Sequence, residues 1–235
     1  MKRNTDYKNA SLAALKGNWG KAVLATVIYM AVMYIAMGPY LYQTFQFRAT
    51  MTATGVMALD ADVLAMLSKL YGYMGLYYLI MIFVIMPLSL GYFNALRLLL
   101  VQGDREIPSN MYKIATKNYW HKVWGMFLMV LFIALWSLLL VIPGIIKMFS
   151  YAMTPYILEE NPELSANEAI DRSRAMMKGH KFDLFWLFLS FIGWGILCVF
   201  TLGIGTLWLT PYMQTSVAAF YEDVKADYEV NGGLI

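Results

Sequence analysis

Long apolar stretches alternate with short polar ones along most of the chain. About 20 mainly apolar residues in a helix are enough to cross the hydrocarbon core of a bilayer. The stretches interpreted as spans are residues 19–42, 71–100, 120–142, 145–158, 182–201 and 206–221. The pattern therefore predicts an all-α protein, a polytopic membrane helical bundle of about six transmembrane helices.

The fourth of these stretches, 145–158, is the shortest. We expect it to tilt, to thin the bilayer locally or only to re-enter it. Four spans combined with re-entrant pieces is therefore the alternative to six, and whether the fourth stretch crosses the bilayer fully stays open.

One apolar run, 135–158, is far too long for a single helix of a soluble domain. Pro143-Gly144 breaks this run, and Glu159 and Glu160 close it. Because a proline has no backbone N–H with which to continue a helix, we expect the chain to turn at Pro143-Gly144 and to return as a membrane hairpin.

The polar stretch 43–70, rich in threonine and alanine, is expected to be the longest loop of the protein. Gly38-Pro39 marks the far end of the span before it, and Asp60 is placed to cap a helix that begins near Ala61. Two further features close the chain: a tight turn at 202–205 and a charged tail at 222–229.

Three polar or amphipathic segments precede the predicted hairpins, and their apolar residues keep helical spacing. This spacing predicts interfacial helices that lie along the headgroups. In the third segment Ser165 and Glu168 form a capping box, and Gly179 is where that helix is expected to stop. We interpret the chain as a single integral-membrane domain, 1–235, with hairpin units at about 5–101, 102–160 and 161–222 and a polar tail at 223–235.

The segments that lead into the first two hairpins align without a gap. The shared residues are Asn9 and Asn110, Ala14 and Ala115, Lys16 and Lys117, Trp19 and Trp120, and Lys21 and Lys122. A third, looser copy at 171–181 has Lys178-Gly179 in the place of Lys16-Gly17. Either the three units are true repeats, or lysine and tryptophan recur because three helices enter the membrane from one side.

Each return leg contains a proline, namely Pro87, Pro155 and Pro211. A proline removes one backbone hydrogen bond, so the carbonyls near Phe83, Tyr151 and Leu207 need partners from protein or water. The three kinked helices could surround a polar cavity, or their threonines could simply bond to their own backbone. The polar residues of such a cavity would be Ser150, Thr154, Thr210 and Gln214.

Composition strengthens the membrane interpretation. The chain is 60% hydrophobic and 14% charged, whereas soluble domains average about 45–50% and about 25%. Aromatic residues make up 16%, as expected when rings gather at two membrane interfaces. The net charge of +3 is small and its basic residues are dispersed, which argues against nucleic acid as a partner. The single cysteine, Cys198, forms no intramolecular disulfide, and we expect the first span to be uncleaved.

The basic residues predict the orientation of the chain. Arg48 and Lys69 alone fall clearly outside when the N-terminus is cytoplasmic, with Lys147 near the outer end of a hairpin. The positive-inside rule therefore predicts cytoplasmic N- and C-termini and an even number of spans. The residues placed inside are Lys2, Arg3, Lys8, Lys16, Lys21, Arg97, Arg105, Lys113, Lys117, Lys122, Arg172, Arg174, Lys178, Lys181 and Lys225.

Few residues suggest chemistry. His121 and His180 lie at the cytoplasmic boundary without the spacing of a metal site, so a headgroup-facing role is expected. Lys147 is expected to snorkel to the outer surface, and Asp183 to pair with Lys181 or Lys122 or to begin its helix. No phosphate loop, zinc motif or nucleophile elbow occurs. We expect no enzyme, and no catalytic, cofactor-binding or metal-binding residue.

An acidic cluster followed by basic residues lies just inside the predicted membrane. It could dock a cytoplasmic partner or hold anionic lipid through its basic half, or it could be a solvated loop and helix face. The cluster comprises Glu159, Glu160, Glu163, Glu168 and Asp171, followed by Arg172, Arg174, Lys178 and Lys181.

Several motifs together resemble one bacterial integral-membrane family, known as domain of unknown function nine-seven-five. They are residues 17–19, 135–147, 150–156, 168–173 and 176–181. The resemblance covers nearly the whole chain and is weakest at 43–70. It implies a multi-pass protein of the bacterial cytoplasmic (inner or plasma) membrane, and it supplies no activity, cofactor or catalytic residue.

The function expected from the sequence is that of a membrane interaction or accessory protein. The alternative is a transporter or permease-like subunit for a small or amphipathic cargo, which predicts that Thr154, Thr210 and Gln214 face one cavity. The expected partners are the lipid bilayer and a membrane or cytoplasmic protein. The binding residues, the cargo and the oligomeric state stay open.

Overall fold

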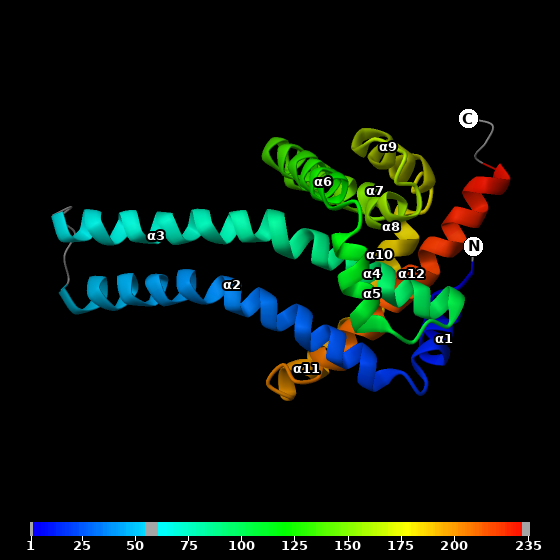
Figure 1. Ribbon diagram of the computed structural model, residues 1–235, viewed down its shortest axis with the longest axis horizontal. Helices are drawn as coiled ribbons and strands as arrows, with labels where there is room; N and C mark the ends of the chain where they lie inside the picture. The colour runs from blue at the N-terminus through cyan, green and yellow to red at the C-terminus, as the bar shows by residue number, and fades with distance from the viewer. Residues whose placement is uncertain (1, 55–60, 232–235) are drawn as a thin grey trace.

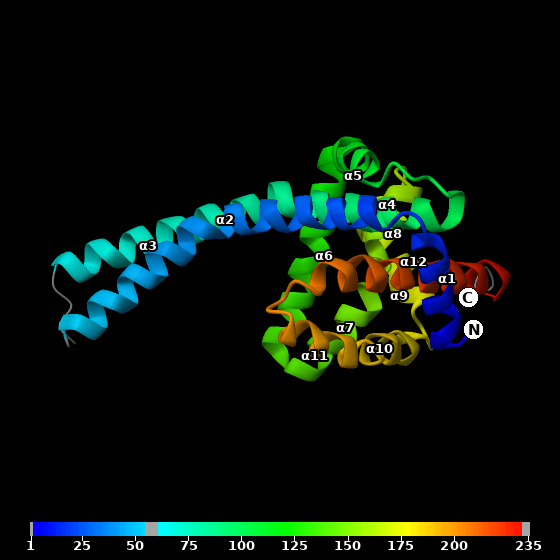
Figure 2. The ribbon, with the colours of Figure 1, turned by 90° about the horizontal axis from the view of Figure 1, so that it is seen from below.

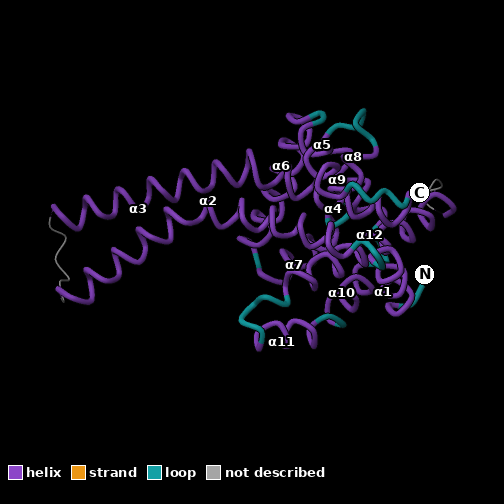
Figure 3. Tube along the Cα trace, turned by 60° about the horizontal axis from the view of Figure 1, so that its bottom comes forward, coloured by secondary structure: helices purple, strands orange, loops and turns teal. Residues whose placement is uncertain are grey.

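The computed structural model describes residues 2–54 and 61–231, and these residues form helices joined by short turns, with no strand among them (Figure 3). The all-α class is thereby confirmed, while the expected cap at Asp60 lies outside the described residues. The helices are α1 Asn4–Leu15, α2 Trp19–Thr54, α3 Ala61–Ile80, the π-helix η1 Met81–Ile85, α4 Met86–Gln102, α5 Ile107–Thr116, α6 Tyr119–Leu139, α7 Val141–Tyr151, α8 Thr154–Glu160, α9 Ala166–Met176, α10 Lys181–Leu189, α11 Ile192–Phe200 and α12 Thr206–Asn231.

Within the described residues, five helical segments are long and apolar enough to cross a membrane. They are Trp19–Ala53, Ala61–Gln102, Tyr119–Leu139, Val141–Glu160 and Lys181–Phe200. The sixth predicted span, 206–221, is the first part of α12 and is not among the five. Its threonine, serine and glutamine residues make it less apolar than the five.

The helices α2 and α3 lie side by side and project far beyond the other helices, forming what we call the arm (Figures 1 and 2). The prediction of a long loop at 43–70 is therefore wrong, and Gly38-Pro39 does not end a helix, because α2 runs through Pro39 to Thr54. A proline removes only one hydrogen bond from a helix. The rings of Tyr40 in α2 and Tyr77 in α3 stack 6.3 Å apart just beyond this point and help to join the two helices.

A π-helical turn, η1, precedes Pro87 where α3 passes into α4. Pro87 cannot bond to the carbonyl of Phe83, four residues earlier. The hydroxyl of Tyr119, at the start of α6, donates to that carbonyl instead. The expectation that the Phe83 carbonyl needs a protein partner is thus confirmed.

The turn between α6 and α7 differs from the prediction. The chain reverses at Leu140, whose backbone is extended, and Pro143-Gly144 lies in the first turn of α7. Proline is tolerated there because the first N–H groups of a helix have no intrahelical partner. Gly144 lets α7 approach α6 closely, since an added Cβ would lie 2.1 Å from Ser137 Oγ.

The last two predicted spans are also rearranged. The stretch 182–201 is divided into α10 and α11 at Ser190-Phe191, and the turn at 202–205 is confirmed, with Leu202 and Gly203 at positive φ. The charged tail 222–229 belongs to α12, so the prediction that it is separate from the last helix is wrong. Val224 is buried, and Glu222, Asp223, Lys225 and Asp227 contact residues of other elements, which packs this part of α12 against the rest of the protein.

The three expected leading helices are present as α1, α5 and α9. The Ser165–Glu168 capping box of α9 is confirmed, with the Glu168 amide donating to Ser165 Oγ and the Ser165 amide donating to the Glu168 carboxylate. Each leading helix is followed by one residue in the left-handed region, and these are Gly17, Asn118 and Gly179. They occupy the same place in the three aligned segments, so the three turns share one backbone conformation.

The core lies where α12 passes among the other helices (Figure 2). A large buried cluster contains Tyr156, Leu184 and Phe220 from α8, α10 and α12. A second cluster, with Leu15 and Leu96, lies between α1, α2, α4 and α5. Only the first turns of α2 belong to a cluster, and the rest of the arm is outside both.

Candidate functional site

The strongest concentration of charge in the described residues joins the C-terminal ends of α4, α8 and α12. Arg97 Nη2 donates to Glu160 Oε1, and Arg97 Nε donates to Glu222 Oε1. The side chains of Arg97 and Glu160 are only 10% and 16% exposed. One guanidinium in α4 therefore bonds to a carboxylate from each of the two other return legs.

Glu160 is the most heavily bonded member of this group. The hydroxyl of Tyr221 donates to Glu160 Oε2, and Lys225 Nζ lies 2.8 Å and 3.0 Å from the two carboxylate oxygens. We call Arg97, Glu160, Glu222, Lys225 and Tyr221 the ion network. It contains two cations and two carboxylates, so its charges balance, as poorly solvated charges require.

Two tyrosines pack beside the ion network. The Arg97 guanidinium lies 5.3 Å from the centre of the Tyr221 ring, a distance at which a cation is attracted to the π-face. The Tyr221 ring stacks on that of Tyr156, with 4.7 Å between centroids. The aromatic pair shields the ion network on the side of α8.

A lysine or histidine near the start of α2, α6 and α10 meets a carboxylate, which lies in the turn before α5 in the first case and in α8 and α12 in the other two. In the first two units these pairs are Lys21 with Glu106 and Lys122 with Glu159. In the third, His180 Nε2 lies 3.2 Å from Asp227 Oδ2. We call these the closing pairs. The aligned lysines differ in environment, since the Lys122 side chain is 2% exposed and that of Lys21 is 49% exposed.

The structure corrects the expected pairing of Asp183. Its carboxylate lies 3.5 Å from His180 Nδ1, in the first turn of α10. Lys122, one of its two expected partners, bonds instead to Glu159 and to the Ile114 carbonyl. The expectation that Asp183 begins its helix is confirmed.

The leading helix α1 is attached to α12 through Asp223. The Tyr7 hydroxyl donates to Asp223 Oδ2 over 2.6 Å, and the Lys2 amide donates to the same oxygen over 2.9 Å. Burial alone raises the pKa of Asp223, but these two hydrogen bonds outweigh it and lower that pKa below its ordinary value. Burial and the Asp223 hydrogen bond raise the pKa of Tyr7, which stays protonated.

The acidic cluster proposed from the sequence divides into two groups. Glu159 and Glu160 belong to a closing pair and to the ion network, so the interpretation of the whole cluster as a solvated face is wrong for them. Further along, Glu168 caps α9, and Asp171 makes an exposed ion pair with Arg174.

The histidines and Lys147 make contacts within the protein. His121 Nε2 lies 2.7 Å from the Leu164 carbonyl. Lys147 Nζ lies 4.5 Å from the centre of the Trp136 ring, across the α6–α7 hairpin. Among the residues described, no group of three histidine, cysteine, aspartate or glutamate side chains is arranged to hold a metal ion.

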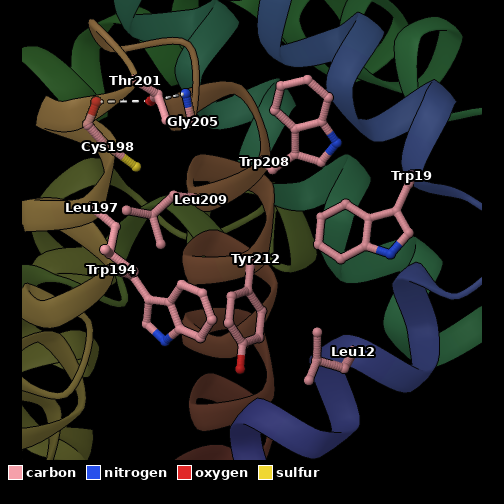
Figure 4. Close-up of a pocket in the computed structure, with 10 residues that line it drawn as sticks. All are labelled: Leu12, Trp19, Trp194, Leu197, Cys198, Thr201, Gly205, Trp208, Leu209 and Tyr212. Atoms are coloured by element: carbon pink, nitrogen blue, oxygen red, sulfur yellow. Dashed lines mark hydrogen bonds between the residues drawn. The ribbon is translucent and has the colours of Figure 1, made fainter.

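Apolar cavities open on the surface of the described residues, and two of them are of similar volume. The first, of about 510 Å³, lies between α1, the start of α2, α11 and α12 (Figure 4). Because Trp19, Trp194 and Trp208 line it, we call it the tryptophan cavity. The second, of about 520 Å³, lies between α2, the η1–α4 junction and α5.

The polar residues expected to share a cavity are placed elsewhere. Ser150 and Thr154 are buried, and Ser150 Oγ donates to the Ile146 carbonyl of its own helix. Thr210 and Gln214 are half-buried on α12. None of the four lines either of the two cavities described above.

The sequence alone could not identify the ion network. It places Glu160 in an acidic cluster, but it places Arg97 only on the cytoplasmic side and Glu222 only in the tail. One available signal is a charge near the end of each return leg, after a long uncharged stretch.

Comparison with known proteins gives one match. Residues 138–228 match a family model described as "Protein of unknown function (DUF975)". The matched part runs from the end of α6 into α12 and contains Glu160, Glu222 and Lys225 of the ion network. No curated protein and no solved structure matches the chain.

Proposed function

Since residues 138–228 match the DUF975 family model, we propose that the chain is an integral protein of the bacterial cytoplasmic membrane that acts as an interaction or accessory protein. In this proposal the chain crosses the bilayer as three hairpins, each preceded by an interfacial helix. The observation that carries the proposal is the arm, because it is much longer than a bilayer is thick.

The length of the arm follows from simple arithmetic. At about 1.5 Å per residue, the 36 residues of α2 span about 54 Å, against about 30 Å for the hydrocarbon core. Part of the arm must therefore project from the membrane.

The charges of the arm indicate which part projects. No charged residue occurs between Lys21 and Arg48, or between Lys69 and Arg97. Arg48, Asp62 and Lys69 all lie toward the tip. The uncharged parts of α2 and α3–α4 therefore suit the bilayer, and residues 48–54 and 61–69 suit the aqueous side beyond it.

The projecting tip carries exposed apolar side chains as well as charges. Leu64 is 54% exposed, and Tyr71 is exposed just below the tip. A rigid helical pair that holds such side chains outside the bilayer is suited to contact another protein. The role requires no catalysed reaction.

The orientation of this arrangement rests on charge. The ion network, the closing pairs and most lysines and arginines lie at the end of the bundle opposite the tip of the arm. With the N- and C-termini cytoplasmic, the tip lies on the outer side. A reporter fused after Glu229 should then give a cytoplasmic signal, and an external signal would overturn this topology.

Photo-crosslinking from two neighbouring positions tests the interaction role. A photoreactive residue at Leu64 points away from the arm, whereas one at buried Val63 points toward its interior. In intact cells the Leu64 position should give a discrete crosslink to another polypeptide, and the Val63 position only crosslinks within the chain. The proposal would be contradicted if both positions gave identical products, or if the Leu64 position gave no crosslink to another polypeptide.

The transporter alternative has less support, because Thr154, Thr210 and Gln214 line neither of the cavities described. It remains testable by replacing Cys198 with alanine and introducing cysteine at each of the three positions. Labelling of all three by a membrane-impermeant thiol reagent would favour a transport path over the accessory role.

A further inference from the structure

Four aromatic side chains line the tryptophan cavity. It is lined by Leu12 of α1, Trp19 of α2, Trp194 and Leu197 of α11, and Trp208 and Tyr212 of α12, among others. In Figure 4 the Trp19 and Trp208 rings lie to one side of Tyr212, and Trp194 and Leu197 lie to the other. No charged residue lines it, so its interior suits an apolar ligand.

With the membrane insertion proposed above, the cavity opens toward the lipid. Trp194, Leu197 and Trp208 are all about half exposed, and α11 lies at the edge of the bundle (Figure 2). Its volume of about 510 Å³ falls within the range of about 300–1,000 Å³ typical of small-molecule sites. A chain from the bilayer can therefore enter it sideways, without crossing water.

Lys8 of α1 and Lys16 at its C-cap lie one turn before and one turn after Leu12, which lines the cavity. The Lys8 ammonium also donates to the Ser190 carbonyl over 2.8 Å. Lys8, Leu12 and Lys16 follow one another at four-residue spacing, which places them on one face of the helix. Lys8 Nζ lies 4.3 Å from the centre of the Phe191 ring, and that ring packs edge-on against Tyr212, 5.1 Å away. Lys16, one turn further on, is exposed.

We propose that the tryptophan cavity binds one acyl chain of an anionic phospholipid, whose phosphate group lies against Lys16 and Lys8. The proposal rests on the membrane insertion proposed above and adds a specific ligand site. An apolar cavity with two lysines at its headgroup end complements a molecule with an acyl chain and an anionic phosphate. A second copy of the chain is a less suitable occupant of the cavity, because it would have to present an anionic surface to the two lysines.

The acyl-chain half of the proposal is tested by filling the cavity. Leu197 and Ile196 are neighbours on α11 and are both 55% exposed, but only Leu197 lines the cavity. Leu197→Trp should occupy the space of the chain, and Ile196→Trp is its matched control. Both positions are open enough to accept an indole without disturbing the core.

Native mass spectrometry of the purified protein can count bound lipid. With phosphatidylglycerol as the probe, the wild-type protein and Ile196→Trp should retain one lipid at low lipid concentration. Leu197→Trp should weaken that binding about tenfold, as expected for loss of a good apolar contact of roughly 1.4 kcal/mol. Equal retention by the two tryptophan variants would overturn the acyl-chain site.

The headgroup half is tested at two aligned lysines, both exposed. Lys16→Gln should weaken phosphatidylglycerol binding about fivefold, since one lysine near an anionic surface contributes about 1 kcal/mol. Lys117→Gln, at the corresponding place after α5, should leave it unchanged. Phosphatidylcholine should bind more weakly to wild type and should not respond to Lys16→Gln. Equal binding of both lipids would overturn the anionic preference.

A separate measurement distinguishes failure of this inference from failure of the proposed function. All four variants should remain in the membrane pellet after alkaline carbonate extraction. Release of the wild-type chain into the supernatant would contradict membrane insertion itself. Retention of all variants without any difference in lipid binding would overturn the lipid site alone.

Discussion

The guanidinium of Arg97 in α4 bonds to the carboxylate of Glu160, the last residue of α8. The two residues lie 63 positions apart in the chain. Through this contact, and the second one from Arg97 to Glu222, the ends of all three return legs are held together. The ion network thus joins α4, α8 and α12 beside the apolar cluster that contains Tyr156 and Tyr221.

Arg97→Ala should strongly destabilise the protein, because it leaves Glu160 and Glu222 without their shared cation. Removing one partner of a poorly solvated pair costs about 3–5 kcal/mol. The control, Arg174→Ala, removes a pair whose side chains are 56% and 63% exposed, and such pairs contribute about 0–1 kcal/mol. Thermal unfolding in mild detergent measures the difference. Equal midpoints for the two variants would show that the ion network does not stabilise the fold.

The aligned lysines Lys21 and Lys122 offer a second comparison. Lys122→Ala should cost about 3–5 kcal/mol, because it leaves Glu159 unpaired beside a buried site. Lys21→Ala should cost at most about 1 kcal/mol, since its pair with Glu106 is exposed. Chemical denaturation of both variants checks this. The expectation fails if the replacement at the exposed position is the more damaging one.

Tyr119→Phe should show how far the hydrogen bond from Tyr119 compensates for the one that Pro87 removes from the α3–η1–α4 helix. Without the tyrosine hydroxyl the Phe83 carbonyl loses its donor, at a cost of about 1–3 kcal/mol. Tyr112→Phe, at an exposed tyrosine of α5, is the control. In a Pro87→Ala background, where a backbone N–H is available again, the cost of Tyr119→Phe should shrink. A cost that does not depend on residue 87 would disprove the link.

Gly144→Ala should separate α6 from α7. The new methyl group would lie 2.1 Å from Ser137 Oγ, and overpacking of this kind costs about 1–3 kcal/mol. Gly193→Ala, in α11, meets nothing within 4 Å and should be neutral or stabilising by up to about 1 kcal/mol. Thermal midpoints of the two variants decide between these outcomes, and a harmless Gly144→Ala would mean that the hairpin can open at no cost.

The contact between Tyr7 and Asp223 should make stability depend on pH in acid. The pKa of Asp223 is lowered in the folded protein from its ordinary value of 3.8. The ionised Asp223 carboxylate therefore stabilises the folded protein above about pH 4. This stabilisation is lost as the pH falls through the pKa of Asp223 in the folded state. Tyr7→Phe should lower the free energy of unfolding at neutral pH. The difference in this free energy between Tyr7→Phe and wild type should become smaller below pH 4. A constant difference across this range would argue against the assignment.

Local patterns were enough to predict much of the secondary structure. The capping box at Ser165 and the left-handed turn at Gly179 depend on neighbouring residues only, and the structure contains both. The same local reasoning failed at 43–70, where a polar composition was taken for a loop. There the pairing of α2 with α3 stabilises helices that composition alone would not indicate.

Other errors came from reading a proline or a charge as a break. Pro39 lies inside α2, because one missing hydrogen bond is a smaller loss than the end of a packed helix. Pro211 lies inside α12, as predicted. The charged tail is helical because Asp223 and Lys225 bond to other helices. Such partners lie far away in the sequence.

By itself, the sequence determined that this protein is all-helical, that long apolar segments suit a lipid environment, and where the leading helices begin. These properties follow from composition, periodicity and turn residues, which act over a few positions. Only the tertiary structure decided that Arg97 meets Glu160 and Glu222, that Lys122 is buried while Lys21 is exposed, and that four helices enclose the tryptophan cavity. The physical reason is that each of these depends on which helix faces come together, and the free energy of that choice is distributed over contacts between distant parts of the chain.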